Sequence, residues 1–175
     1  CACGSTLAVT LPDNLDLTYT GTAQTPEVTV MVDGTTTLAV NTDYSVAYDN
    51  NINAGNTAKV TVTGTAFNGT VEKTFTIEKA TLIVSGNGIF SGTYGMKLSE
   101  LTVGASLAVN SPSGSGVPGK WTLTGDVIPN VGDSGEYTAI FTPVIGAENY
   151  KPLTAQVTLE IDKATPPAPQ TGTLN

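Results

Sequence analysis

Ile77-Glu78-Lys79-Ala80-Thr81 recurs further along the chain as Ile161-Asp162-Lys163-Ala164-Thr165. Each copy closes a stretch in which apolar and polar residues alternate. A matching turn lies upstream of each, Asn53-Ala54-Gly55 in the first copy and Asn130-Val131-Gly132 in the second. A repeat of roughly 80 residues is too long for a solenoid unit and is typical of tandem small domains. The sequence therefore predicts two domains of one kind.

The repeat sets the expected domain boundaries. Residues 1–5 precede the first strand pattern, residues 6–80 form the first domain and residues 81–164 the second. No flexible spacer separates the two domains, because the first copy of the repeated motif runs directly into the next strand pattern. Three prolines make residues 165–175 a linker with an extended backbone. We expect the chain to be a piece of a longer array of such domains.

Alternation with a period of two residues predicts an all-β fold, and no stretch has the apolar spacing of a long helix. Asp33-Gly34 is the strongest hairpin signal. We expect two tandem Ig-like β-sandwiches, and the alternative is a pair of β-grasp-like domains with one short helix at 96–101. The strands expected are 6–11, 15–19, 27–32, 44–48, 59–63 and 72–77 in the first domain, and 81–85, 98–103, 120–124, 136–141 and 155–161 in the second.

Composition excludes some classes of function. The chain has 7 basic residues against 15 acidic ones, a net charge of −8 and no His. A nucleic-acid partner is excluded, because phosphate binding needs clustered cations. The absence of His removes the commonest general base and metal ligand, and no catalytic motif is present, so we do not expect an enzyme. No apolar stretch approaches the ~20 residues that span a membrane.

Several motifs in both copies belong together as a signature. In the first copy they are Tyr19-Thr20-Gly21, Asp43-Tyr44-Ser45-Val46, Asn53-Ala54-Gly55, the strand 60–64 and Phe75-Thr76-Ile77-Glu78-Lys79-Ala80. In the second they are Tyr94-Gly95-Met96-Lys97-Leu98, Gly119-Lys120-Trp121, Pro129-Asn130-Val131-Gly132 and 137–143. These motifs resemble the MBG-type, bacterial Ig-like repeats of large surface proteins of Gram-positive, Firmicutes-type bacteria, and the second copy resembles the YGX variety. The resemblance covers nearly the whole chain between residues 7 and 163.

This resemblance implies an extracellular location, on the bacterial cell surface or secreted. The leading hypothesis is a non-catalytic spacer, a semi-rigid stalk whose partners are the neighbouring repeat domains of the same polypeptide. The alternative is an adhesin module that binds a host glycan or an extracellular-matrix protein through its loops. Two loops are candidates for that contact, residues 111–119 and the insertion around Ile145.

Aromatic side chains are candidates for glycan binding, because they stack on the apolar faces of sugar rings. Trp121 and Tyr150 are the residues we select, and the competing interpretation is that Trp121 anchors the core of a small β domain. Calcium is the one cofactor considered. Asp13, Asp16 and Asp49 offer oxygen ligands, but they lack the spacing of a known calcium loop, and Asx residues also form turns without metal.

Two cysteines, Cys1 and Cys3, lie at the start of the chain. Three interpretations stay open: a remnant of cloning or processing, a lipid-modified or intermolecularly bridged terminus, and a metal or redox pair. A disulfide between molecules would make the chain a filament subunit.

Overall fold

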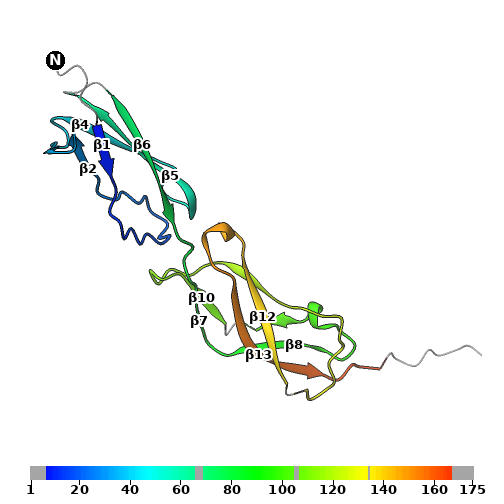
Figure 1. Ribbon diagram of the computed structural model, residues 1–175. Helices are drawn as coiled ribbons and strands as arrows, with labels where there is room; N and C mark the ends of the chain where they lie inside the picture. The colour runs from blue at the N-terminus through cyan, green and yellow to red at the C-terminus, as the bar shows by residue number, and fades with distance from the viewer. Residues whose placement is uncertain (1–6, 66–68, 105–106, 134, 167–175) are drawn as a thin grey trace, which may run out of the picture. The chain divides into compact units, whose positions relative to one another are not determined.

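The computed structural model describes residues 7–65, 69–104, 107–133 and 135–166 (Figure 1). About half of the residues lie in β-strands, and no helix within these ranges reaches seven residues. Two single-turn 3-10 helices occur in the described part, Leu98–Glu100 and Ala147–Asn149. The predicted all-β class is therefore confirmed. No helix in these ranges is both long and apolar enough to cross a membrane.

The chain forms two compact units. Unit 1 comprises Cys1–Thr81 together with Gly146–Lys151, and unit 2 comprises Leu82–Ile145 and Pro152–Asn175. The main division thus falls after Thr81, close to the end of the first sequence repeat. The short segment Gly146–Lys151 belongs to unit 1, although the repeat alone assigns it to the second domain.

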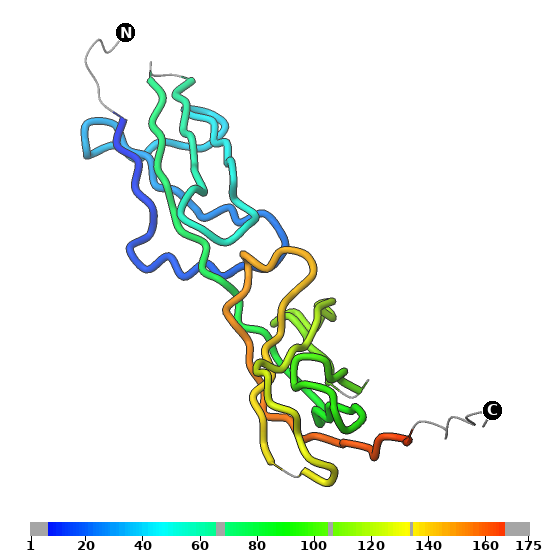
Figure 2. Tube along the Cα trace, turned by 90° about the vertical axis from the view of Figure 1, so that its right-hand side faces the viewer, coloured from blue at the N-terminus to red at the C-terminus, as the bar shows by residue number. Residues whose placement is uncertain are grey.

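Unit 1 contains two antiparallel sheets of three strands each. The first has the order β1-β2-β3, and the second has the order β4-β5-β6. β1 also lies beside β6, as the dark blue and green traces show (Figure 2). The bounds are β1 Leu7–Thr10, β2 Thr29–Val32, β3 Thr36–Thr37, β4 Tyr44–Asp49, β5 Gly55–Gly64 and β6 Thr70–Ile77.

Period-two alternation builds the core of unit 1. On β5, Ala58, Val60 and Val62 are buried, while Lys59 and Thr61 between them are more exposed. Both sheets contribute buried side chains to a single cluster, and each fully buried Val stabilises the fold by about 1.5–3 kcal/mol. The buried members of the cluster are Val9, Val28, Val30, Val32, Leu38, Tyr44, Ala58, Val60, Val62, Phe75 and Ile77.

Unit 2 contains one sheet of five strands and one of two. The larger sheet has the order β11-β12-β13-β8-β9, and the smaller pairs β7 with β10. All pairs are antiparallel except β8 with β13, which run in parallel from Gly88↔Val157 to Thr93↔Asp162. The bounds are β7 Ile83–Ser85, β8 Gly88–Thr93, β9 Thr102–Val103, β10 Ala108–Asn110, β11 Gly119–Leu123, β12 Glu136–Pro143 and β13 Leu153–Asp162.

The two units share a strand plan. Strands β4-β5-β6 and β11-β12-β13 form equivalent antiparallel meanders, and β1 with β2 corresponds to β7 with β10. The closing strand also bonds an early segment in the same way in each unit. Tyr19 N donates to Glu78 O at 2.9 Å, and Tyr94 N donates to Asp162 O at 2.8 Å. Figure 1 shows β12 and β13 side by side in unit 2, as the ladder between them requires.

Some predicted elements differ from the structure. The expected strand at 15–19 is wrong, because only Thr18 forms a bridge there, to Glu78. Residues 98–103 form a 3-10 turn and the two-residue strand β9 in place of one strand. The hairpin signal is confirmed: Asp33 and Gly34 both have positive φ, 52° and 70°, as a type I′ turn requires.

Candidate functional site

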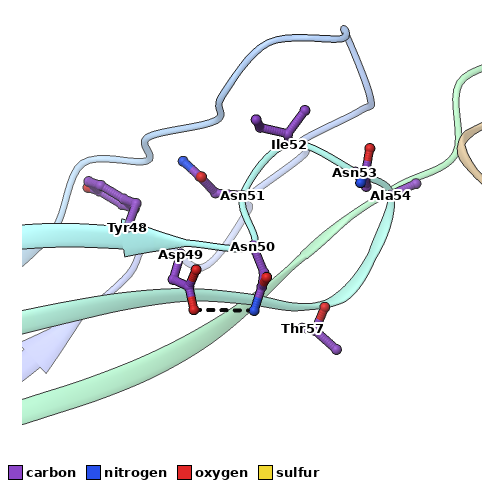
Figure 3. Close-up of a pocket in the computed structure, with 8 residues that line it drawn as sticks. All are labelled: Tyr48, Asp49, Asn50, Asn51, Ile52, Asn53, Ala54 and Thr57. Carbon is purple, nitrogen blue, oxygen red and sulfur yellow. Dashed lines mark hydrogen bonds between the residues drawn. The ribbon is translucent and has the colours of Figure 1, made fainter. Parts of the chain in front are cut away.

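An open cavity of about 430 Å³ lies on the loop that joins β4 to β5 (Figure 3). Tyr48 and Asp49 line it from the end of β4, and Thr57 lines it from β5. The loop itself provides Asn50, Asn51, Ile52, Asn53 and Ala54. The cavity therefore belongs entirely to unit 1, and its lining is mostly neutral and polar.

Asparagine side chains fix the conformation of this loop. Asn50 has a φ of 54°, in the left-handed region that Asn tolerates better than most residues. Its Nδ2 donates to Asp49 Oδ2 at 3.3 Å (Figure 3). Asn51 Nδ2 donates to Gln24 O at 2.8 Å, and Gln24 N donates back to Asn51 O at 2.8 Å. This reciprocal pair anchors the loop to a distant part of the chain.

Tyr48 supports the base of the cavity. Its hydroxyl donates to Pro26 O, and its ring meets Phe75 edge to face, with centroids 6.4 Å apart. Burial raises the pKa of Tyr48 above its usual value, and the nearby Tyr44 and Glu27 raise it further. The phenol therefore stays protonated at neutral pH and keeps its role as a donor.

The far side of the loop is held by Asn149, which is only 2% exposed. Ala54 N donates to Asn149 Oδ1 at 2.8 Å, and Asn149 Nδ2 donates to Asn53 Oδ1 at 3.2 Å. Gly146, with a φ of 66°, begins the 3-10 turn that presents this side chain. The carboxamide thus satisfies one donor and one acceptor of the turn 53–55.

Backbone and ring contacts extend the attachment of the same segment. Ala80 N donates to Asn149 O at 2.9 Å, and Lys151 N donates to Ala80 O at 2.9 Å. The rings of Tyr150 and Tyr19 meet edge to face, with centroids 5.5 Å apart. Burial raises the pKa of Tyr150, and the neighbouring Tyr19 adds to the effect. We call Asn53, Ala54, Tyr19 and Ala80 the turn surface of unit 1, and Gly146–Lys151 covers it.

The chemistry of the cavity follows from its lining. Asp49 is the one carboxylate among the lining residues, and the Asn side chains are largely engaged in the bonds just described. Calcium takes six to eight oxygen ligands, usually with several carboxylates. A neutral ligand rich in hydroxyl groups matches this lining better than a metal ion does.

The three aspartates proposed as calcium ligands do not belong to a cluster of metal-binding side chains in the described residues. Asp13 and Asp16 are exposed on the segment between β1 and β2, with Asp13 in a turn, and Asp49 ends β4. Among the residues that the structure describes, no three His, Cys, Asp or Glu side chains gather in a way that could hold a metal ion.

Trp121 and Tyr150, the two glycan candidates, lie in different units. Trp121 is 6% exposed on β11 and packs against Phe141, with ring centroids 5.1 Å apart, as a core residue does. Its indole N–H is buried without a hydrogen-bond partner in the described ranges, which costs about 1–3 kcal/mol. Tyr150 is half-buried against Tyr19. The Trp121 ring is therefore buried in the core and has no free face to stack on sugars.

The candidate loops have ordered backbones. Ser111 N donates to Ser115 O at 2.8 Å, and Gly114 N donates to Ser111 O at 2.9 Å. Ile145, in the other loop, is 77% exposed. Cys1 and Cys3 lie outside the described residues.

No family model matches the sequence, and no curated protein is found as a relative.

Sequence reasoning did not identify Asn149 or Gln24. The loop that they hold can be recognised in the sequence by its run of Asn residues and by the repeated turn 53–55. Asn149 carried no local signal, because its partner at Ala54 is 95 positions away in the chain. Its near-complete burial is visible only in the folded structure.

Proposed function

We propose that this chain is a non-catalytic repeat module of a bacterial cell-surface protein, built from two Ig-like domains and working as an extracellular spacer. The observation that carries the proposal is the strand plan shared by two consecutive units, down to the matching bonds of Tyr19 and Tyr94. Two consecutive domains with the same strand plan and no spacer in the sequence between them suit a protein that acts as a spacer better than one that catalyses a reaction. The resemblance of the motifs to surface-protein repeats supports the extracellular location.

The parallel pair β8 and β13 supports a load-bearing role for unit 2. These are an early and the last strand of the unit, and they share a ladder from Gly88↔Val157 to Thr93↔Asp162. Because the strands are parallel, force applied from the ends of the unit acts at opposite ends of the ladder. The hydrogen bonds then resist in shear, all together, and do not open one by one.

Single-molecule stretching tests this proposal. With handles at the two chain ends, we expect unit 2 to unfold at a high force in one step. The matched control attaches the handles at residues 135 and 163, at the same end of the antiparallel ladder of β12 and β13. That geometry opens the ladder bond by bond and should need less force. Equal forces in the two geometries would contradict a load-bearing role.

An adhesin function is the second candidate, and the open polar cavity at residues 48–57 favours it. A glycan array and a panel of fibronectin, collagen and mucin test it. A specific hit that is lost in Asn50→Ala, and kept in a control such as Asn110→Ala in unit 2, would support binding at the cavity. Uniform absence of binding supports the spacer.

A further inference from the structure

The turn surface of unit 1 has a counterpart in unit 2. The repeat places Tyr94 at the position of Tyr19, Asn130 and Val131 at those of Asn53 and Ala54, and Ala164 at that of Ala80. The matching backbone bonds, Tyr19 N to Glu78 O and Tyr94 N to Asp162 O, show that the Tyr and the closing strand are equivalent in three dimensions. We call these four residues of the second copy the turn surface of unit 2.

The two turn surfaces differ in what covers them. In unit 1, Ala80 is fully buried and Tyr19 is half-buried, because Gly146–Lys151 packs on them. In unit 2, Tyr94 is 51% exposed and Val131 is 42% exposed, and Ala164 is also exposed. Two more apolar side chains lie just before the turn, and both are exposed: Ile128 is 47% exposed and Val127 is 61% exposed. Unit 2 therefore presents an uncovered apolar version of a surface that is occupied in unit 1.

We propose that the turn surface of unit 2 is a docking site for a loop of the same chemistry as Gly146–Lys151, provided by another module of this type. Unit 1 shows the contacts that such a loop makes. An Asn carboxamide accepts from the turn N–H, the following Tyr ring packs on the Tyr that both copies of the repeat have, and the loop backbone pairs with Ala80. In unit 2 the partners are Val131 N, the Tyr94 ring and the backbone of Ala164.

The side chains of unit 2 offer more apolar area to the Tyr ring of such a loop than those of unit 1 do. Val131 replaces Ala54, and Ile128 replaces Asn51, so the second turn surface has more apolar area to bury. Removing apolar area from water is favourable and adds to the hydrogen bonds that the loop provides. The inference rests on the proposed function, since it supposes that modules of this type stand next to one another.

A fused chain tests the docking site. Residues 82–175 are joined directly after Thr165, so that Ala164-Thr165-Leu82 reproduces the junction Ala80-Thr81-Leu82. Only residues 1–165 are isotopically labelled, by ligation, so that their signals are seen alone. We expect hydrogen exchange at the amides of Val131 and Ala164 to slow by about fivefold to tenfold relative to the original chain, the effect of one net hydrogen bond.

Two variants of the appended copy separate docking from mere proximity. Asn149→Ala should remove most of the protection at Val131, whereas Ile145→Ala, which changes an exposed neighbour of the loop, should keep it. Unchanged exchange on fusion, or equal protection with Asn149→Ala, overturns the proposal.

A peptide titration gives a second measurement that does not depend on folding of the appended copy. The peptide of residues 144–153 should shift the signals of Tyr94 and Val131 in the unfused labelled chain, and the Asn149→Ala peptide should not. Absent shifts with the peptide, or equal shifts with the Asn149→Ala peptide, also overturn the docking site. That result leaves the stretching and binding tests of the spacer untouched, so the two proposals fail separately.

Discussion

Units 1 and 2 follow one plan but join their early and closing strands differently. In unit 2 the contact is a parallel ladder between β8 and β13 that extends from Gly88 to Thr93. In unit 1 the matching segment makes a single parallel bridge, Thr18↔Glu78. One repeated sequence pattern therefore allows both a long ladder and a near-minimal contact, and side chains at a few positions decide between them.

Glycine is the main difference at these positions. A Cβ on Gly88 would lie 2.5 Å from Val157 Cγ1, closer than real Cβ contacts allow. The bare backbone of Gly88 thus lets β8 approach β13. The repeat places Asp13 at this position in unit 1, where it is exposed in a turn. The ladder of unit 2 therefore depends on close packing of the Gly88 backbone against a stiff, β-branched neighbour, Val157.

The largest effect is expected from Phe90→Ala. Phe90 is fully buried on β8, and its loss should lower the free energy of unfolding of unit 2 by about 3–5 kcal/mol through lost burial and the cavity left behind. Leu15→Ala, the matched change in unit 1, should cost less, because Leu15 is only partly buried against the core. Denaturant unfolding followed by fluorescence of Trp121, the single Trp, reports on unit 2, and hydrogen exchange at the buried amides of β5 reports on unit 1. Equal losses in the two units would contradict the comparison.

Gly88→Ala should have the next largest effect. The added methyl meets Val157, which is 2% exposed and rigid at its β-branch, so β8 has to move away from β13. Overpacking of this kind costs about 1–3 kcal/mol. Hydrogen exchange along β8 should accelerate as the ladder weakens. Ile89→Thr, a change at a more exposed position on the same strand, is the control and should leave exchange on β8 nearly unchanged.

Asn149→Ala is expected to loosen the turn surface of unit 1. It leaves the N–H of Ala54 and the side-chain oxygen of Asn53 without the partner they have now. Losing the hydrogen bond of this partly buried donor costs about 0.5–1.5 kcal/mol, so the amide of Ala54 should exchange faster. Asn149→Asp keeps the acceptor for the Ala54 N–H and loses the donor to Asn53. Its exchange rate at Ala54 should therefore lie between those of the wild type and Asn149→Ala. No change at Ala54 would mean that the carboxamide does not hold the turn.

Period-two alternation predicted the central strands well, because the core is built by the same alternation. Val60, Val62, Phe75 and Ile77 are all buried as the pattern implies. The segment 15–19 shows the limit of that reasoning. Its Leu15 and Leu17 pack against the core, so the apolar pattern is real, but the backbone finds a strand partner only near Glu78. Alternation reports on which face is buried and does not report on backbone pairing.

The candidate site was harder to predict than the fold. The Asn-rich loop could be recognised from its composition, whereas the residues that hold it could not. Gln24 and Asn149 are distant from the loop in sequence and sit in stretches without a distinctive pattern. Strand β10 was missed for a related reason, since three residues beside a loop rich in Ser, Pro and Gly give too short a pattern to recognise.

The smallest effect is expected at a surface ion pair across the meander of unit 1. Lys59 Nζ lies 2.9 Å from Glu72 Oε1, and both side chains are substantially exposed. The hydrogen bond and charge of Lys59 lower the pKa of Glu72, and those of Glu72 raise the pKa of Lys59. In unit 2 the repeat places Glu136 at the position of Lys59 and Gln156 at that of Glu72, and these two side chains cannot form an ion pair.

The sign of the pH dependence follows from Glu72. Its pKa is lower in the folded state than in the unfolded state, so the pair stabilises unit 1 above the unfolded-state pKa, and this contribution is lost as the pH falls through the folded-state value. Glu72→Gln should therefore slightly destabilise unit 1 at neutral pH and make no difference in acid. Added salt should also shrink the difference, because exposed charges are screened. Unit 2, measured by Trp121 fluorescence in the same samples, should not respond to the substitution. A difference between wild type and Glu72→Gln that persists in acid would show that Glu72 acts through packing and not through its charge.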